Sequence, residues 1–516
     1  MKLPDTLSRF LPGGAWLAAA LAGAANTLAF APFGLWPLAV LSPLALYLLL
    51  RGLDARAAFT RGFAYGFGFW LAGVSWVFVS IHVYGYTPLP MAIALTLAFA
   101  AMLSLLFFAW WTAVYAWLAR GILRPAVFVA LWLLGEWVRS WLFTGFPWLY
   151  QGYAVIDTPL SGFAPVGGVL LVSVIMLACA VLLADIVTGT RRARLVAVAA
   201  IAALFAGGAL LRGIDWTSPV KTADGMTRSL SVSLVQGNIP QDMKWLMEMQ
   251  EPTIEIYAEL TRNEWGRDLL IWPESAVPKL VHESLPLIDA LRTRADASHS
   301  AFITGMPYAY THNGIPVFHN TVLSIGGPSG LRMYHKVHLV PFGEVVPFAD
   351  LLRAIAPFFS LQGIPLQGFT PGDDHQPPLP AGDHRLATFL CYEIVYADYV
   401  RKQARSADIL LTVSNDAWFG TSHGPHQHFQ IARMRALETG RWLLRGTNTG
   451  MTGIVDPSGR VTARAEPYTR TVLRGDVLPM QGDTPFMIVG EWPVLGAIAL
   501  VLLMALRRTR AGLATP

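Results

Sequence analysis

The segment LATFLCYEIVYAD, residues 386–398, sets a short apolar run directly before a cysteine, a tyrosine and a glutamate. The run is typical of a buried β-strand, so Cys391 is expected where that strand meets a loop. A thiol at such a place is a candidate nucleophile, although a lone cysteine is also commonly a small buried apolar residue. The second cysteine, Cys179, lies in the apolar run 170–187, and no disulfide between the two is predicted.

Two charged residues upstream complete a set for covalent acyl chemistry. Glu274 follows the apolar letters LLIWP, and Lys336 lies in YHKVHLVPFGE. A carboxylate can take the proton of a thiol, and an ammonium can stabilise both a thiolate and a developing oxyanion. The alternatives are a surface or capping glutamate and a solvated lysine at a strand end. On a regular strand Lys336 and His338 would share a face while His335 points away, so both could approach the site.

The composition of the chain indicates a membrane protein. Of the 516 residues, 54% are hydrophobic and only 14% are charged, which is too apolar for one ordinary soluble enzyme. The formal net charge is +5, but the basic residues stand in short clusters at the ends of apolar runs. This placement is typical of membrane topology, and nucleic-acid binding is not expected.

About eight transmembrane helices are predicted from apolar runs of roughly twenty residues. The runs start near Gly13, Leu35, Phe63, Pro90, Ala126, Gly168, Leu195 and Met487. Arginines cluster in alternate connections and after the last run, around Arg56, Arg120, Arg192 and Arg508. By the positive-inside rule both termini are cytoplasmic, and the long segment from about Arg212 to Pro485 lies on the extracytoplasmic side.

That long segment reads as an α/β domain. Short β-rich runs within 229–238, 269–275, 301–308, 320–327, 386–393 and 409–416 alternate with helical stretches at 246–265 and 428–441. Glycine-rich turns are predicted at 326–330 and 456–459. The predicted organisation is a membrane domain over 1–212, an α/β domain over 213–485, and a last span with a cytoplasmic tail over 486–516.

The order of four motifs carries a resemblance to a known family. WPES, HKVHLVPFGE, CYEIVY and VSNDAWFG resemble the nitrilase (carbon-nitrogen hydrolase) superfamily, whose members use a Glu, Lys and Cys triad. With the predicted spans, GNIPQDMKW near the start of the domain and GPHQHFQIARMRALETGR near its end, nearly the whole chain resembles the bacterial apolipoprotein N-acyltransferases. The resemblance implies an αββα sandwich and a location in the bacterial cytoplasmic (inner) membrane, with the catalytic domain periplasmic.

The resemblance also implies roles for particular residues. Glu274 would be the general base, Lys336 the electrostatic stabiliser and Cys391 the nucleophile. Residues that match family motifs and would support the triad or the substrate are Glu344, Glu393, Tyr392, Trp245, Asn415 and Trp418. A phospholipid would donate the acyl group, through a Cys thioester in a ping-pong cycle, and the α-amine of a diacylglyceryl-modified apolipoprotein would accept it. A monomer without a cofactor is expected.

Other reactions and classes fit parts of the pattern. A membrane-tethered amidase or nitrilase would use the same triad and water, and a transporter or receptor would bind a ligand with its outer domain. The apolar segment LLRAIAPFFSLQGIPL, residues 351–366, is a mobile lid, an arm that dips into the membrane, or an amphipathic packing helix.

Two further groups of polar residues have open interpretations. His423, His426 and His428 match no zinc spacing, so no metal is expected, and substrate contact or a loop is favoured. Glu136 and Arg139 share a helix face inside an apolar run. They are either an intramembrane ion pair that stabilises the bundle or a site that positions lipid or lipoprotein.

Overall fold

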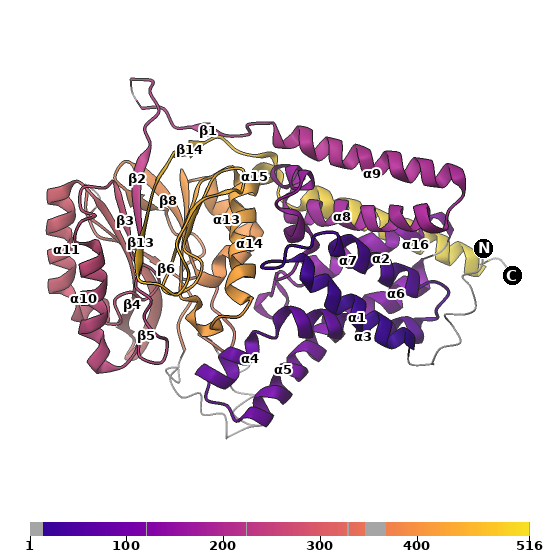
Figure 1. The fold of residues 1–516 in the computed structure, drawn as a ribbon, viewed down its shortest axis with the longest axis horizontal. Coiled ribbons are helices and arrows are strands. Elements are labelled where there is room, and N and C mark those ends of the chain that lie inside the picture. Colours follow the sequence, from indigo (N-terminus) through magenta and orange to yellow (C-terminus); the bar gives the residue numbers. More distant parts are fainter. Residues whose placement is uncertain (1–13, 120, 223, 328–329, 346–367, 515–516) are drawn as a thin grey trace. The chain divides into compact units, whose positions relative to one another are not determined.

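The chain folds into two compact units, each described here by itself (Figure 1). The computed structural model describes residues 14–119, 121–222, 224–327, 330–345 and 368–514. The helical unit comprises the chain up to His82, Thr87–Asp215 and the part from Ile488 on, and the α/β unit comprises Val83–Tyr86 and Trp216–Met487. The segment 351–366, predicted as a lid or packing helix, lies outside the described residues.

The helical unit consists of apolar helices with short connections. They are α1 (Gly14–Asn26), α2 (Leu38–Leu49), α3 (Ala55–Val74), α4 (Val77–Val79), α5 (Leu89–Ser104), α6 (Trp110–Leu118), α7 (Arg124–Val138), α8 (Ala164–Thr188), α9 (Arg191–Arg212) and α16 (Trp492–Ala514). A π-helical segment, Leu105–Ala109, joins α5 to α6, so the two form one continuous stretch.

Several of these stretches are long and apolar enough to cross a membrane. Within the described residues they are Leu89–Leu118, Gly121–Val138, Pro159–Thr188, Arg191–Arg212 and Trp492–Ala511, and the pair Ala55–Val74 and Val77–Tyr84, bent by 60°, is a sixth if it forms one span. The prediction of several apolar helices is confirmed. The number eight stays a prediction, because α1 and α2 have only 13 and 12 residues and a straight span needs about 20.

Small residues let the helices of this unit pack closely. A Cβ at Gly68 of α3 would lie 2.0 Å from the carbonyl oxygen of Ala20 in α1, and one at Gly62 would lie 2.0 Å from the hydroxyl of Thr112 in α6. Only glycine permits these backbones to approach so closely. The side chain of Asp54 caps α3 by accepting a hydrogen bond from the Ala57 N–H (2.7 Å).

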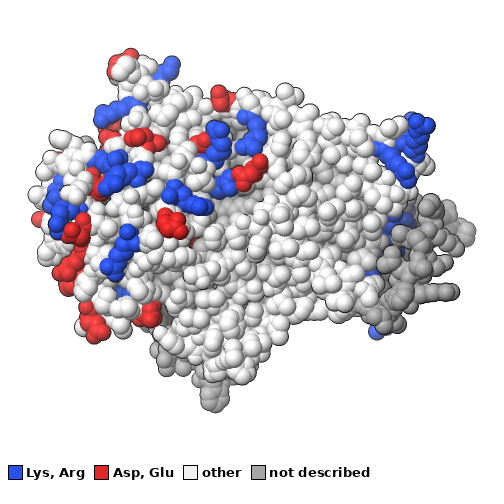
Figure 2. All heavy atoms as spheres, in the orientation of Figure 1, with Lys and Arg blue, Asp and Glu red and all other residues white. Residues whose placement is uncertain are grey.

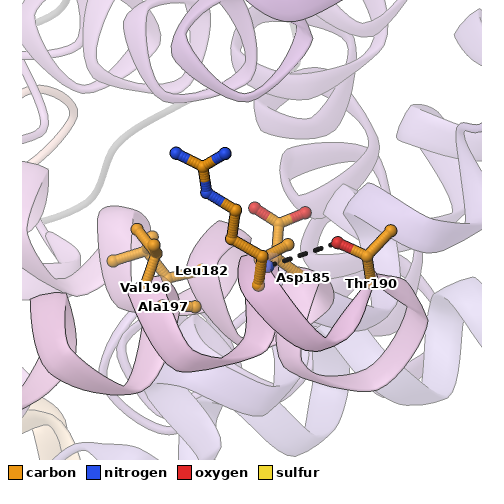
Figure 3. Close-up of a pocket in the computed structure, with 7 residues that line it drawn as sticks. Leu182, Asp185, Thr190, Val196 and Ala197 are labelled. Atoms are coloured by element: carbon orange, nitrogen blue, oxygen red, sulfur yellow. Dashed lines mark hydrogen bonds between the residues drawn. The ribbon is translucent and has the colours of Figure 1, made fainter.

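The surface of the helical unit differs from that of the α/β unit. On the face drawn in Figure 2, charged side chains gather over the α/β unit, while most of the helical unit is uncharged and its basic side chains gather at one end. A small pocket lies where α8 turns into α9, and Asp185 and Thr190 are among its lining residues (Figure 3). The Thr190 hydroxyl caps α9 by accepting a hydrogen bond from the Ala193 N–H (3.3 Å). An uncharged belt between polar ends is what a lipid environment selects.

The α/β unit is built on two six-stranded sheets. One has the order β13-β2-β3-β4-β5-β6 and the other β12-β11-β10-β9-β8-β7, while β1 and β14 form a separate pair. The strands are β1 (Ser218–Pro219), β2 (Leu230–Gln236), β3 (Leu269–Ile271), β4 (Ala301–His312), β5 (Ile315–Ile325), β6 (Arg332–His335), β7 (Leu379–Ala381), β8 (His384–Leu390), β9 (Ile409–Ser414), β10 (Leu443–Thr447), β11 (Gly453–Val455), β12 (Val461–Arg464), β13 (Thr471–Val477) and β14 (Met480–Gln481).

The helices of the α/β unit are α10 (Gln250–Thr261), α11 (Leu285–Ser298), α13 (Ala397–Ala404), α14 (Gly424–Thr439) and, at its boundary, α15 (Pro485–Val489). A core that includes Leu234, Leu390 and Leu411 joins the inner faces of the two sheets. Figure 1 shows α10 and α11 outside one sheet and α13 and α14 outside the other, so the layers run helix, sheet, sheet, helix. The predicted α/β domain with an αββα sandwich agrees with these layers.

The local predictions for this unit agree with its elements. The six β-rich runs overlap β2, β3, β4, β5, β8 and β9, and the two helical stretches overlap α10 and α14. The strands β4 and β5 are longer than predicted, and β8 and α14 begin earlier. The predicted turn at 456–459 joins the antiparallel neighbours β11 and β12. The predicted turn at 326–330 includes residues 328 and 329, which lie outside the described residues, and the strands on either side of it, β5 and β6, pair antiparallel. Parallel pairing of β2 with β3 and of β8 with β9 brings the carboxyl ends of these strands to matching edges.

Candidate active site

Three strand ends supply the predicted triad. Glu274 lies in the loop after β3, Lys336 directly follows β6, and Cys391 directly follows β8. The first two strands belong to one sheet and the third to the other. The site is therefore built where the two sheets face each other at their strand ends.

Glu274 is buried, and hydrogen bonds fix both of its carboxylate oxygens. Oε1 accepts from the side-chain amide of Asn320 (2.8 Å) and lies 3.8 Å from the Lys336 Nζ. Oε2 accepts from the backbone N–H of Asn415 (2.7 Å). Gly305 of β4 makes room for this loop, since a Cβ there would lie 2.6 Å from the nitrogen of Ser275. The carboxylate is therefore held in one position.

Lys336 is buried between two carboxylates. Its Nζ lies 2.7 Å from Oε2 of Glu344, in addition to its contact with Glu274. Burial works against the charged form, but Glu344 and Glu274 outweigh it and raise the pKa of Lys336 above its ordinary value. The side chain is thus a permanent ammonium beside the other two members of the triad.

Cys391 is partly exposed and has a left-handed backbone with φ of 52°. Burial of the sulfur and the negative charge of Glu274 raise the pKa of the thiol well above its ordinary value, while Lys336 lowers it. Both charged groups are therefore within electrostatic range of Sγ. The resting side chain is a thiol, and it needs a base in order to attack a carbonyl carbon.

Glu393 ties the nucleophile to the lysine segment. One carboxylate oxygen accepts from the N–H groups of Val337 (2.6 Å) and His338 (3.1 Å). The other accepts from the Leu390 N–H (2.6 Å) and the Tyr334 hydroxyl (2.9 Å). Burial raises the pKa of Glu393 to about 7, against the effect of these donors. Glu393 thus connects the backbone beside Lys336 to the backbone beside Cys391.

Other residues named from the motifs lie around this centre. Glu344 also accepts from the Asn320 amide (2.9 Å), and the Asn415 side chain donates to Gln241 (2.6 Å). Tyr392 is buried with its ring edge-on to Tyr396. Trp245 and Trp418 are instead 48% and 42% exposed, and the Trp418 ring packs edge-on against Tyr84 at 5.9 Å.

The alternation expected for the lysine segment required a regular strand, and that condition is not met. The strand β6 ends at His335, so Lys336 and His338 do not lie on a regular strand. The His338 ring stacks on Tyr396 at 4.2 Å, and the His335 ring packs against His319 at 4.5 Å. The amino group between the carboxylates is that of Lys336, and His338 is a packing neighbour.

Sequence reasoning missed two buried polar side chains beside the triad. Lys244 donates from Nζ to the carbonyl oxygen of Glu274 (3.0 Å), and burial lowers its pKa to about 8. Its only signal was a position inside the motif GNIPQDMKW. Asn320 joins Glu274 to Glu344, and its place in the β-rich run 320–327 marked it only as a strand residue.

The histidine stretch begins helix α14, so the loop predicted for it was wrong. His423 is the N-cap residue, and His426 and His428 lie in the first two turns. His428, Asp416 and Cys391 place possible ligand atoms within 4.8 Å of one another, a group that could hold a metal ion. The Arg445 guanidinium donates to Asp416 (2.7 Å), so a positive charge already balances this carboxylate. The donor set is therefore poor for a cation.

Glu136 and Arg139 lie in the helical unit, buried and 4.0 Å apart. Oε1 of Glu136 accepts from the Trp132 indole (3.2 Å) and from the backbone N–H of Gln151 (3.0 Å). The Arg139 guanidinium lies over the rings of Trp70 and Tyr150, 4.9 and 4.8 Å from their centroids. These contacts hold the buried segment after α7 in place, which favours the stabilising role.

Comparison with known proteins agrees with both units. Residues 22–182 match the apolipoprotein N-acyltransferase N-terminal domain, and residues 231–480 match the carbon-nitrogen hydrolase domain. An apolipoprotein N-acyltransferase of Azotobacter vinelandii is 44% identical over 513 residues, covering 97% of this chain and 96% of that protein.

Two further relatives with the same name are similar over their whole lengths. The protein of Pseudomonas aeruginosa strain PAO1 is 41% identical, covering 95% of each chain. The protein of Vibrio vulnificus is 40% identical, covering 96% of this chain and 97% of the relative. The chain belongs to the apolipoprotein N-acyltransferase family.

Proposed function

We propose that this enzyme moves a fatty acyl chain from a membrane phospholipid to the α-amine of the N-terminal diacylglyceryl-cysteine of apolipoproteins, the last step of lipoprotein maturation. The observation that carries the proposal is the buried Glu274–Lys336 pair in electrostatic range of the Cys391 thiol. The full-length relationship to apolipoprotein N-acyltransferases supports the choice of substrates.

In the first half-reaction Glu274 takes the proton of the Cys391 thiol as sulfur attacks the ester carbonyl. Lys336 stabilises the oxyanion of the tetrahedral intermediate. When the intermediate collapses, the carbon–oxygen bond to the glycerol breaks, and the departing alkoxide receives the proton from Glu274. A lysophospholipid leaves, and a thioester remains on Cys391.

In the second half-reaction the α-amine of the acceptor attacks this thioester. Glu274 takes a proton from the attacking nitrogen and returns it to sulfur as the carbon–sulfur bond breaks. An N-acyl amide leaves and the thiol is restored. In this scheme Glu344, Glu393 and Asn415 hold the triad, while Tyr392, Trp245 and Trp418 contact the lipid substrates.

The proposed topology places this chemistry at the outer surface of the bacterial cytoplasmic membrane. The membrane domain is 1–212, the periplasmic catalytic domain is 213–485, and 486–516 contains the last of eight spans and a cytoplasmic tail. Division of the described chain near Asp215 and Met487 supports these boundaries, and the arginine clusters support two cytoplasmic termini. We propose that the enzyme acts as a monomer.

The proposal is tested by incubating the purified protein with phospholipid alone and analysing it by intact and peptide mass spectrometry. A hydroxylamine-sensitive acyl group on Cys391, discharged by a diacylated lipopeptide amine, is expected. Cys391→Ala should form no adduct, and Glu274→Gln or Lys336→Ala should form it roughly 100- to 1,000-fold more slowly.

Each alternative function has its own outcome in this experiment. A folded protein that forms no adduct with phospholipid would favour either a membrane-tethered amidase or nitrilase, which cleaves C–N bonds, or a receptor or transporter. An adduct that is discharged only to water would contradict transfer to the amine. An unchanged rate in either the Glu274 or the Lys336 variant would remove that residue from the triad.

A further inference from the structure

Three buried residues behind Cys391 form a polar network that the proposed reaction does not use. Asp416 follows β9, His428 lies in α14, and Arg445 lies in β10, all fully buried. His428 Nε2 lies 3.1 Å from the carbonyl oxygen of Cys391, and Nδ1 lies 3.0 Å from Oδ1 of Asp416. Arg445 Nη2 is 2.7 Å from Oδ2 of Asp416 and 3.0 Å from Nδ1 of His428.

We propose that His428, oriented by Asp416 and Arg445, is a positioning residue that anchors the backbone of the nucleophile. The inference rests on the proposed function, because it assumes that Cys391 carries the acyl group. A carbonyl oxygen can only accept a hydrogen bond, so His428 Nε2 must carry a proton to make this contact. The anchor is therefore an N–H of the imidazole that points at the Cys391 carbonyl.

The contact with the Cys391 carbonyl requires a proton on Nε2, and two states of the imidazole supply it while Nδ1 keeps a partner. When the ring is doubly protonated, Nδ1–H donates to Asp416. When the ring is neutral, Nδ1 accepts from Arg445, and the single ring proton stays on Nε2. Asp416 remains a carboxylate, since Arg445 and His428 outweigh its burial and lower its pKa to about 2. With Asp416 and Arg445 both at Nδ1, that nitrogen has a hydrogen-bond partner in each of these two states, and Nε2–H donates to the Cys391 carbonyl in both.

The backbone of Cys391 needs such an anchor because of its conformation. A φ of 52° is unfavourable for a residue with a Cβ, and it persists only where surrounding contacts hold it. Holding the carbonyl fixes the plane of the following peptide bond. The direction of the Cα–Cβ bond, and with it the position of Sγ relative to Glu274, is fixed by the same contact.

A matched pair of substitutions separates anchoring from general stability. In His428→Gln the amide nitrogen reaches about as far as Nε2 and can still donate to the Cys391 carbonyl. In His428→Asn the amide reaches only about as far as Nδ1, so it keeps a partner in Asp416 and loses the anchor. Both variants replace the ring by a neutral amide of similar polarity, and both are made in the full-length protein.

The test measures acyl-enzyme formation from phospholipid together with alkylation of Cys391 by iodoacetamide, read on the Cys391 peptide. His428→Gln should stay within about threefold of the parent, while His428→Asn should acylate about 100-fold more slowly, because small misplacements of reacting groups cost rate steeply. The half-saturating phospholipid concentration and the thermal unfolding temperature should be unchanged, and alkylation of Cys391 should slow in His428→Asn alone.

Equal acylation rates in His428→Gln and His428→Asn would overturn the proposal that His428 anchors the Cys391 carbonyl. An equal loss of acylation rate in both variants, together with a lower unfolding temperature, would overturn it as well. Alkylation keeps this test separate from the proposed function. If the parent protein forms no acyl adduct, the proposed function fails, and the difference in alkylation between His428→Gln and His428→Asn still decides whether His428 positions the thiol.

Discussion

At the scale of single residues, the candidate site balances charge around one thiol. Glu274 and Glu344 bring two carboxylates, and Lys336 brings one ammonium that contacts both. Lys244 adds a second amino group, buried and hydrogen-bonded to the backbone of Glu274. Because burial lowers the pKa of Lys244 to about 8, this second positive charge is present at neutral pH and is lost as the solution becomes alkaline.

This titration predicts the pH dependence of acyl-enzyme formation. The ammonium of Lys244 stabilises negative charge on sulfur and on the oxyanion, so the rate should fall as the pH rises from about 7 to 9. Lys244→Met should be about tenfold slower at pH 7, the effect of losing one charge-assisted hydrogen bond. Its rate should also lack the decline near pH 8. The rate of acyl-enzyme formation would be measured at each pH by stopping the reaction at intervals and analysing the protein by mass spectrometry. A decline of the rate near pH 8 that persists in Lys244→Met would mean that another group titrates there.

At the scale of elements, the position of Glu274 depends on the strand beneath it. Gly305 of β4 lies under the loop that follows β3, and there is no space for a Cβ between the two backbones. The sheet register sets this close approach, since β3 pairs with β4 through Ile271 and Ile303 directly before the loop. A glycine that seems only to weaken a strand thus shapes the site.

Gly305→Ala should therefore displace the Glu274 loop while the sandwich stays folded. We expect acyl-enzyme formation to fall by about 100-fold, as for other small misplacements of a catalytic group. The matched control is Gly446→Ala in β10, whose Cβ would meet Ile271 at an ordinary 3.4 Å. Equal activities of the two variants, at similar unfolding temperatures, would show that the loop tolerates the displacement.

At the scale of the whole molecule, the two units have opposite surface chemistry. The helical unit contains the long apolar stretches, and the α/β unit carries most of the charged side chains on the face drawn in Figure 2. A chain so divided suits an enzyme whose substrates are held in a bilayer while the bond that reacts lies at its surface. The arginine clusters near Arg56, Arg120, Arg192 and Arg508 favour the proposed orientation, with both termini cytoplasmic.

The proposed orientation makes a prediction about reporter fusions to the full chain. Alkaline phosphatase inserted in the exposed turn at Asn313 and Gly314, between β4 and β5, should be active, because this reporter folds only outside the cytoplasm. A fluorescent protein fused after residue 516 should fluoresce in the cytoplasm. The reverse pattern, in cells that contain full-length fusion protein, would place the catalytic domain inside.

Most elements of the α/β unit, and the residue types that suit acyl chemistry, could be predicted from the sequence. Apolar runs followed by polar residues located Glu274 and Cys391 at strand ends, because burial and the period of side chains are local properties. Hydropathy located the apolar helices for the same reason. It did not settle their number, since α1 and α2 are shorter than a membrane span.

Only the tertiary structure decided which distant residues meet. Asn320 reaches both Glu274 and Glu344, and His428 reaches the Cys391 carbonyl, across separations of up to 46 residues. Such contacts depend on strand order and register, which no local pattern encodes. Likewise, the strand β6 ends at His335, and the contact of Lys336 with Glu344 follows from the tertiary structure rather than from alternation along a strand.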